Sequence, residues 1–194
     1  MLYNFDEAAL YVCLTTLAML LVILRFQKRS FSYLLFFLIF GIYMIGVVSV
    51  VIFPIAMPDP GAMEQWGFRP SINLIPFNFG NCFMYDICVE QIIQNVILTM
   101  PFGFGVSFIA RLRARDFVWL PLAIGLGFEF SQFMVSRGGF HALDINDVLL
   151  NAAGAWLGYA CFRAFAWLYR AVTRRLGINP WGVFAYIQDV VSRA

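Results

Sequence analysis

Five long apolar stretches constrain this chain more than any other feature of its sequence. Each has roughly the 20 residues that a helix needs to cross the hydrocarbon core of a bilayer. Charged residues make up 12% of the 194 residues, against about 25% in an ordinary soluble domain. The stretches cover residues 8–24, 31–53, 86–109, 117–135 and 144–169. We therefore predict an all-α fold, a polytopic transmembrane helix bundle with about five spans.

The basic residues indicate how this bundle is oriented. They cluster after the first, third and fifth stretches, at Arg25, Lys28 and Arg29, at Arg111, Arg113 and Arg115, and at Arg170, Arg174 and Arg175. Short loops rich in Lys and Arg stay in the cytoplasm, so we predict an external N-terminus and a cytoplasmic C-terminus. An acidic start, Asp6 and Glu7, precedes the first stretch where a signal peptide would be basic. We therefore expect this stretch to be a retained helix.

No linker or internal repeat divides the chain, so we expect residues 1–176 to form a single transmembrane domain and residues 177–194 a cytoplasmic tail. In the tail, Asn179 is a typical helix cap and Pro180 a typical first helical residue. Apolar residues then recur at helical spacing, at Trp181, Phe184, Ile187 and Val191. This pattern predicts a short C-terminal amphipathic helix in the membrane interface.

Polar side chains concentrate in residues 129–158. A charge inside an apolar segment costs free energy unless it has a partner or a water-filled cavity, so it usually marks function. Spacings of three and four residues place one set on a single helix face: Asp144, Asp147, Asn151, Gly154 and Gly158. The last two form a GxxxG pattern, which lets another helix approach closely. We therefore expect this face to contact a neighbouring helix.

The predicted topology brings further polar residues to the same depth. Gln94 and Asn95 lie in the first turns of the third stretch, at its outer end, while Glu129 and Gln132 lie in the outer half of the fourth. Arg137 and His141 follow in the outer turn, so we expect a polar pocket in the outer half of the bundle. The connection at residues 71–79 is too apolar for a solvated loop, so we expect it in the interface or folded over the pocket. Pro101 predicts either a plain kink or a broken helix that borders a cavity.

Four pieces of the sequence together resemble the VanZ-like membrane protein family. They are Asn-Leu-Ile-Pro-Phe at residues 73–77, Asn95 followed by Pro-Phe-Gly at 101–103, Glu-x-x-Gln at 129–132, and Asp-x-x-Asp-x-x-x-Asn-x-x-Gly at 144–154. The family places an arginine close before the two acids, whereas Arg137 lies further upstream, so its equivalence stays open. The resemblance implies a multi-pass plasma-membrane protein. It also implies a link to resistance against teicoplanin-type glycopeptide antibiotics, which act on lipid-linked cell-wall precursors at the outer leaflet.

Three hypotheses for the pocket follow. In the first, it binds an outer-leaflet lipid, a lipid-linked cell-wall precursor or a glycopeptide, with ligand contacts from Asn73, Gln94, Asn95, Gln132, Arg137, His141 and Asn151. In the second, the protein is an intramembrane enzyme acting on a polyprenyl-phosphate-type lipid. Its candidate catalytic residues are Glu129, Asp144 and Asp147, because paired carboxylates can divide acid and base roles. In the third, the polar residues only hold the helices together. Asp144 and Asp147 also suit an N-cap and the third helical position.

Cofactors and other partners are less constrained. We expect no organic cofactor and no nucleic acid, and the acids leave a divalent cation open. Cys82 and Cys88 lie near the predicted outer surface, so a disulfide between them also stays open. Neither a CxxC pattern nor a Cys/His ligand set occurs, which argues against a structural zinc site.

Overall fold

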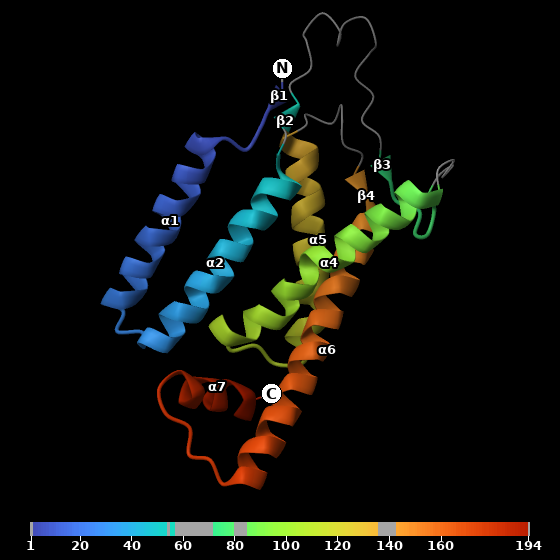
Figure 1. The fold of residues 1–194 in the computed structure, drawn as a ribbon. Helices are drawn as coiled ribbons and strands as arrows, with labels where there is room; N and C mark the ends of the chain where they lie inside the picture. The colour runs from blue at the N-terminus through green and yellow to red at the C-terminus, as the bar shows by residue number, and fades with distance from the viewer. Residues whose placement is uncertain (1, 54, 57–71, 80–84, 136–142, 194) are drawn as a thin grey trace, which may run out of the picture.

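The computed structural model describes residues 2–53, 55–56, 72–79, 85–135 and 143–193. These form a helical bundle, and five of its helices are long and apolar enough to cross a membrane (Figure 1). The long helices are α1 (Glu7–Phe26), α2 (Phe31–Val51), α4 (Tyr85–Ile109), α5 (Asp116–Val135) and α6 (Ile145–Leu176). A shorter helix, α7 (Val183–Ser192), follows near the C-terminus. The predicted five-span bundle with a short C-terminal helix is confirmed.

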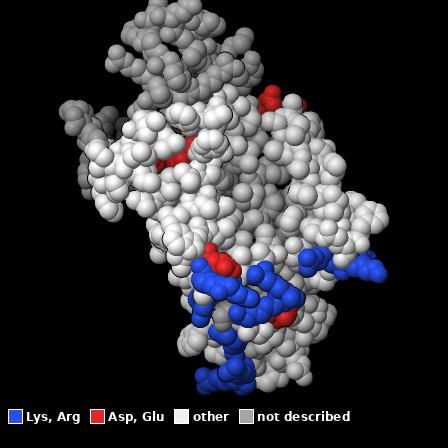
Figure 2. Space-filling model, turned by 180° about the vertical axis from the view of Figure 1, so that it is seen from behind, with Lys and Arg blue, Asp and Glu red and all other residues white. Residues whose placement is uncertain are grey.

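The long helices alternate in direction, so their ends gather at two levels (Figure 1). We call one level the sheet end, because two short strand pairs lie there. β1 (Leu2–Tyr3) pairs antiparallel with β2 (Ile55–Ala56), and β3 (Ile72–Asn73) pairs parallel with β4 (Leu143–Asp144). We call the other level the basic end, because Lys and Arg side chains gather there (Figure 2).

Capping residues define where several helices begin and end. The Asp6 carboxylate accepts a hydrogen bond from the backbone N–H of Ala9 at the start of α1, over 2.9 Å. Ser30 caps α2 in the same way. α6 ends at Gly177, whose φ of 59° is a left-handed conformation that costs glycine little. These groups satisfy backbone donors and acceptors that a helix terminus leaves without partners.

Glycines allow α4 and α6 to pack backbone against backbone. A Cβ atom added at Gly158 would lie 1.9 Å from the carbonyl oxygen of Met100, and one at Gly154 would lie 2.2 Å from that of Val96. From the other side, a Cβ on Gly103 would lie 1.9 Å from the carbonyl oxygen of Ala155. We call this contact the glycine seam. It confirms that the face carrying Gly154 and Gly158 meets a neighbouring helix.

Aromatic side chains fill the basic half of the bundle. Phe117 of α5 stacks on Tyr159 of α6 with ring centroids 3.7 Å apart. Val190 of α7 is buried against Phe108 of α4 and Phe162 of α6, so α7 covers the end of the bundle. α1 packs mainly along α2 and exposes most of its apolar side chains, as expected for a helix that faces lipid.

The structure corrects two predicted boundaries. α6 continues to Leu176 instead of ending near residue 169. Its last turns stay helical although they carry arginine. α7 begins at Val183, so the predicted start at Pro180 is wrong. Gly182 precedes it with a φ of 60°, which a right-handed helix does not contain. The chain therefore turns between Gly177 and Gly182 before the helix starts.

Two further expectations have mixed outcomes. α4 passes through Pro101 as one helix, and Pro101 also lines an apolar groove of about 490 Å³ between α2, α4 and α6. The segment 72–79 lies beside the start of α6, and none of it lines the polar cavity described below. Its large apolar side chains, Leu74, Ile75 and Phe77, are exposed, as expected for a membrane interface.

Candidate functional site

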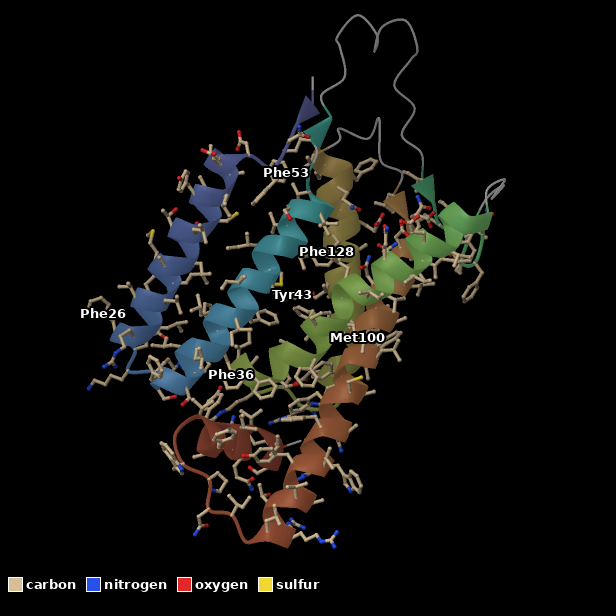
Figure 3. All side chains as sticks on the ribbon, in the orientation of Figure 1. Phe26, Phe36, Tyr43, Phe53, Met100 and Phe128 are labelled. Carbon is tan, nitrogen blue, oxygen red and sulfur yellow. The ribbon has the colours of Figure 1, made fainter. Side chains whose placement is uncertain are left out.

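A polar cavity of about 700 Å³ opens at the sheet end between α2, α4, α5 and α6. Figure 3 shows oxygen and nitrogen atoms gathered around the sheet ends of α4 and α6, with Phe128 of α5 nearby. The polar side chains that line the cavity are Gln91, Gln94, Asn95, Glu129, Gln132, Asp144, Asp147 and Asn151. The apolar part of its lining comes from Val50, Val51, Ile97, Leu98 and Phe128. No Lys or Arg among the described residues lines it.

Glu129 is the most buried acid of this cavity, with 2% of its surface exposed. Its side-chain oxygen Oε2 accepts a hydrogen bond from the backbone N–H of Asp144 over 3.0 Å. The bond ties α5 to the start of α6. Close packing of the two helices supports it, because a Cβ added at Gly125 would lie 2.6 Å from the carbonyl oxygen of Val148.

Two hydrogen bonds join α4 to α6 across the cavity wall. The Asn95 amide donates to Oδ1 of Asp147 over 2.8 Å. One turn further along α4, the buried Thr99 hydroxyl donates to the carbonyl oxygen of Asn151 over 2.7 Å. Both bonds lie beside the glycine seam, which holds the two helices close enough to form them.

Asn151 retains an unused acceptor. Its amide nitrogen donates to the carbonyl oxygen of Asp147 over 2.9 Å. Its Oδ1 atom is buried and has no hydrogen-bond donor among the described residues. A buried polar atom without a partner costs free energy, so this position of the wall favours a donor supplied from within the cavity.

Asp144 contributes to the fold at the mouth of the cavity. Its carboxylate accepts from the backbone N–H of Asn146 over 2.8 Å, which confirms it as the N-cap of α6. The same carboxylate accepts from the amides of Asn73 and Asn146. Asn146 in turn accepts from the backbone N–H of Phe77 over 2.6 Å. These bonds fasten the segment 72–79 to α6, so Asp144 has a structural role whatever else it does.

The glutamines of the cavity are less constrained. Gln94 donates to the Glu90 carboxylate one turn earlier on α4, over 2.9 Å. Gln132 is half-buried, and its side chain forms no hydrogen bond with a described residue. Its amide is therefore available to the interior of the cavity.

The acids do not form a preassembled metal site within the part of the chain that the structure describes. No group of three or more Asp, Glu, His or Cys side chains lies close enough there to hold a metal ion. Whether the protein binds the divalent cation that the sequence leaves open is not tested by this geometry.

The comparison with protein families agrees with this architecture. The family model described as VanZ/LLP1 matches residues 40–168. The chain belongs to the VanZ/LLP1 family. No curated protein and no solved structure gives a significant match. The VanZ/LLP1 match begins within α2 and ends within α6, so it contains every residue that lines the polar cavity and leaves out α1 and α7.

The structure places most of the candidate residues together. Seven of them line the cavity, and Asn73 is attached to its rim through Asp144. Arg137, His141 and Cys82 lie outside the described residues, so the pairing of Cys82 with Cys88 is not tested.

Sequence reasoning missed Asn146 and Thr99, which are 2% and 0% exposed. Asn146 has a signal in the sequence, because it is an amide next to Asp147 and two residues after Asp144. Thr99 follows Asn95 by four residues and therefore lies on the same face of α4.

Proposed function

We propose that this VanZ/LLP1 protein binds the polar headgroup of a membrane lipid, or of a lipid-linked cell-wall precursor, in its polar cavity. The observation that carries the proposal is the cavity wall itself. Carboxylates and amides from α4, α5 and α6 surround about 700 Å³ within a bundle of apolar helices. A site inside a membrane that had only to hold helices together would have no need of this volume.

The cavity opens to the outer leaflet in this proposal. The support is the positive-inside rule, because the basic turns lie at the opposite end of the bundle (Figure 2). The N-terminus is then external, and α7 is cytoplasmic. The membrane is the plasma membrane, as for the family that the sequence resembles.

The wall favours a headgroup rich in hydrogen-bond donors. The carboxylates of Glu129 and Asp147 are hydrogen-bond acceptors, and so is Oδ1 of Asn151, which has no donor among the described residues. Sugar hydroxyls, amides and amines are donors of this kind. A phosphate on the ligand would need a cation, and the sequence offers Arg137 between α5 and α6 for that role.

An apolar chain on the ligand has a path beside the cavity. Ile97 of α4 lines both the cavity and the apolar groove of about 490 Å³ that runs between α2, α4 and α6. Tyr43 of α2 lines the groove, and its hydroxyl donates to the carbonyl oxygen of Leu98 over 2.6 Å. The polar headgroup and the apolar chain of one amphiphile would therefore occupy adjoining sites. Through the family resemblance, a glycan-bearing lipid of this type connects the cavity with susceptibility to glycopeptides.

Native mass spectrometry of the purified full chain tests the proposal. The probes are a polyprenyl-diphosphate-linked amino sugar, the same polyprenyl diphosphate without sugar, and phosphatidylcholine. We expect the sugar-bearing lipid to be retained preferentially. Gln132→Leu and Asn151→Leu should each weaken its binding by about tenfold, because each removes one hydrogen-bonding group from the wall.

Gln188→Leu is the matched control. Gln188 lies in α7 at the other end of the bundle and also has a buried side-chain oxygen without a partner among the described residues. Thermal unfolding in phosphatidylcholine verifies that each variant folds. Equal retention of all three probes, or unchanged binding by both cavity variants, would show that the cavity is only structural. Release of a product from the sugar-bearing lipid, abolished in Glu129→Gln, would instead assign an enzyme.

A further inference from the structure

A second cavity, of about 370 Å³, lies at the basic end of the molecule. The turn between α4 and α5, the middle of α6 and the last residues of α7 surround it. Four arginines line it: Arg111, Arg113, Arg163 and Arg193. Three separate parts of the chain, which lie between Arg111 and Arg193 in the sequence, therefore bring guanidinium groups to one hollow.

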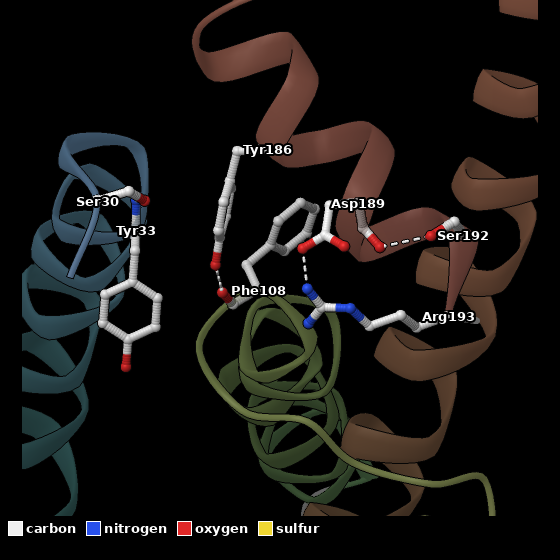
Figure 4. A network of polar contacts seen from close by, with 7 residues as sticks. All are labelled: Ser30, Tyr33, Phe108, Tyr186, Asp189, Ser192 and Arg193. Atoms are coloured by element: carbon white, nitrogen blue, oxygen red, sulfur yellow. Dashed lines mark hydrogen bonds and ion pairs between the residues drawn. The ribbon is translucent and has the colours of Figure 1, made fainter.

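Carboxylates neutralise only part of this charge. Arg193 forms an ion pair with Asp189, one turn earlier on α7 (Figure 4). Asp116 lies nearby, but it pairs with Arg115 at 4.0 Å and accepts from the backbone N–H of Arg113. Arg111, Arg113 and Arg163 form no ion pair with a described carboxylate. The hollow therefore carries an excess of positive charge.

The depth of Arg163 places the hollow at the boundary of the membrane. Arg163 lies 18 residues after the start of α6, or roughly 27 Å along the helix axis. The hydrocarbon core of a bilayer is about 30 Å thick. Because α6 starts at the sheet end, Arg163 lies near the opposite edge of a hydrocarbon core of this thickness, where its long side chain can extend toward the lipid phosphates.

Topology alone does not account for this arrangement. The positive-inside rule requires basic residues in loops and near helix ends, with no particular geometry. Arg163 is instead in the middle of α6, and Arg193 reaches across the end of α4 from α7 (Figure 4). α7 is held there by its buried Val190 and by a hydrogen bond from the Tyr186 hydroxyl to the carbonyl oxygen of Phe108. The fold of the C-terminal segment thus completes the hollow.

The remaining walls suit a group at the edge of a bilayer. Leu112, Phe162 and Val190 provide apolar surface, while Ser107 and Tyr159 provide hydroxyl groups. Guanidinium groups bind phosphate oxygens through two parallel hydrogen bonds, which makes arginine the usual partner of phosphate. Basic pockets between helices on the cytoplasmic side are suited to anionic lipid headgroups.

We propose that the four-arginine hollow binds a phosphate group at the cytoplasmic boundary of the membrane. The site is separate from the polar cavity and does not depend on the function proposed for it. The phosphate can belong to an anionic phospholipid of the inner leaflet or to a soluble phosphate compound, and the test distinguishes the two.

The test compares two double variants of the full chain in nanodiscs of phosphatidylcholine. Arg111→Gln/Arg163→Gln removes two guanidinium groups from the hollow. Arg174→Gln/Arg175→Gln removes two exposed ones from the last turn of α6, outside the hollow. Net charge changes equally in both. Phosphatidylglycerol is titrated into one series of samples and inorganic pyrophosphate into another, with lipid retention in native mass spectrometry and the shift in Tm as readouts.

We expect wild type to retain phosphatidylglycerol over phosphatidylcholine and the hollow variant to lose about tenfold in that preference, while the control variant keeps it. A Tm increase with pyrophosphate but not with phosphatidylglycerol, lost in the same variant, also supports the site and assigns the soluble source. Equal losses in both double variants, or no preference in wild type for either probe, would overturn the proposal. If the glutamine variant does not fold, Arg111→Lys/Arg163→Lys replaces it. This variant keeps the charge but not the two-pronged donor geometry, so undiminished binding would contradict the proposed mode of recognition.

Discussion

Gly158→Ala tests the glycine seam most directly. The added Cβ atom would lie 1.9 Å from the carbonyl oxygen of Met100 and 2.9 Å from the backbone nitrogen of Phe104. Ordinary contacts begin at 3.4 Å, so the two helix backbones must move apart at this point. A flexible side chain could turn away, but backbone atoms within a helix cannot. We therefore expect a loss of about 3 kcal/mol in the free energy of unfolding, the upper end of what overpacking usually costs.

The same separation should weaken the polar wall of the cavity. The Asn95–Asp147 and Thr99–Asn151 hydrogen bonds cross the seam at 2.8 and 2.7 Å, and neither tolerates a large increase in distance. Folded Gly158→Ala protein should therefore also bind the sugar-bearing lipid less tightly than wild type.

Denaturant unfolding of the purified protein in bicelles measures the loss. Gly127→Ala is the matched control, since Gly127 lies within α5 and a Cβ there meets nothing within 4 Å. It should change stability by less than about 1 kcal/mol. If Gly158→Ala unfolds at the same denaturant concentration as Gly127→Ala, the close approach of α4 and α6 is refuted.

Three further outcomes are expected. Thr99→Val should lower the free energy of unfolding by about 0.6–1.7 kcal/mol in bicelles, the range for interhelical hydrogen bonds, and Thr99→Ser should restore most of it; equal stability of Thr99→Val and wild type would show that the bond to Asn151 contributes nothing. Burial raises the pKa of the Tyr186 hydroxyl above its ordinary 10.0, although nearby arginines oppose this. The native state therefore holds this proton more tightly than the unfolded state does. The stability that the protonated hydroxyl contributes is present below pH 10 and is lost as the pH rises through the native pKa. Thermal unfolding should accordingly show wild type losing its advantage over Tyr186→Phe in that alkaline range, and a constant difference would contradict the assignment. In intact cells, a membrane-impermeant thiol reagent should label Asn4→Cys but not Ser192→Cys, each in a background with the native cysteines replaced, and the reverse pattern would invert the proposed orientation.

Hydropathy was enough to predict the five spans, because the hydrophobic pattern of a membrane helix depends on its own residues and not on its neighbours. The same criterion placed the end of α6 too early. Arg170, Arg174 and Arg175 are polar, yet a helix that has left the hydrocarbon core no longer needs apolar side chains. The start of α7 was misplaced for a related reason. Asn179 and Pro180 suit a helix start, but the left-handed backbone at Gly182 shows that the chain is still turning there.

The candidate site was predictable to the extent that helix periodicity determines it. Spacings of three and four residues placed Asp144, Asp147 and Asn151 on one face, and the structure brings that face to α4. The partner of each side chain was not predictable, because it depends on the rotation of each helix about its axis. The bond from the Asp144 backbone to Glu129 and the role of Asn146 in holding the segment 72–79 therefore emerge only from the fold.

The glycine seam has a consequence for how this family can vary. The wall formed by α4 and α6 has no free volume, so almost any enlargement of a residue there disturbs the backbone. Val50 and Val51 of α2 also line the cavity, and this helix is held to α4 by the hydroxyls of Tyr33 and Tyr43. Val50 is exposed, so substitutions at this position change the shape of the cavity at little structural cost, whereas Val51 is buried. We therefore expect relatives with different ligands to diverge along the end of α2 while the opposite side stays nearly unchanged.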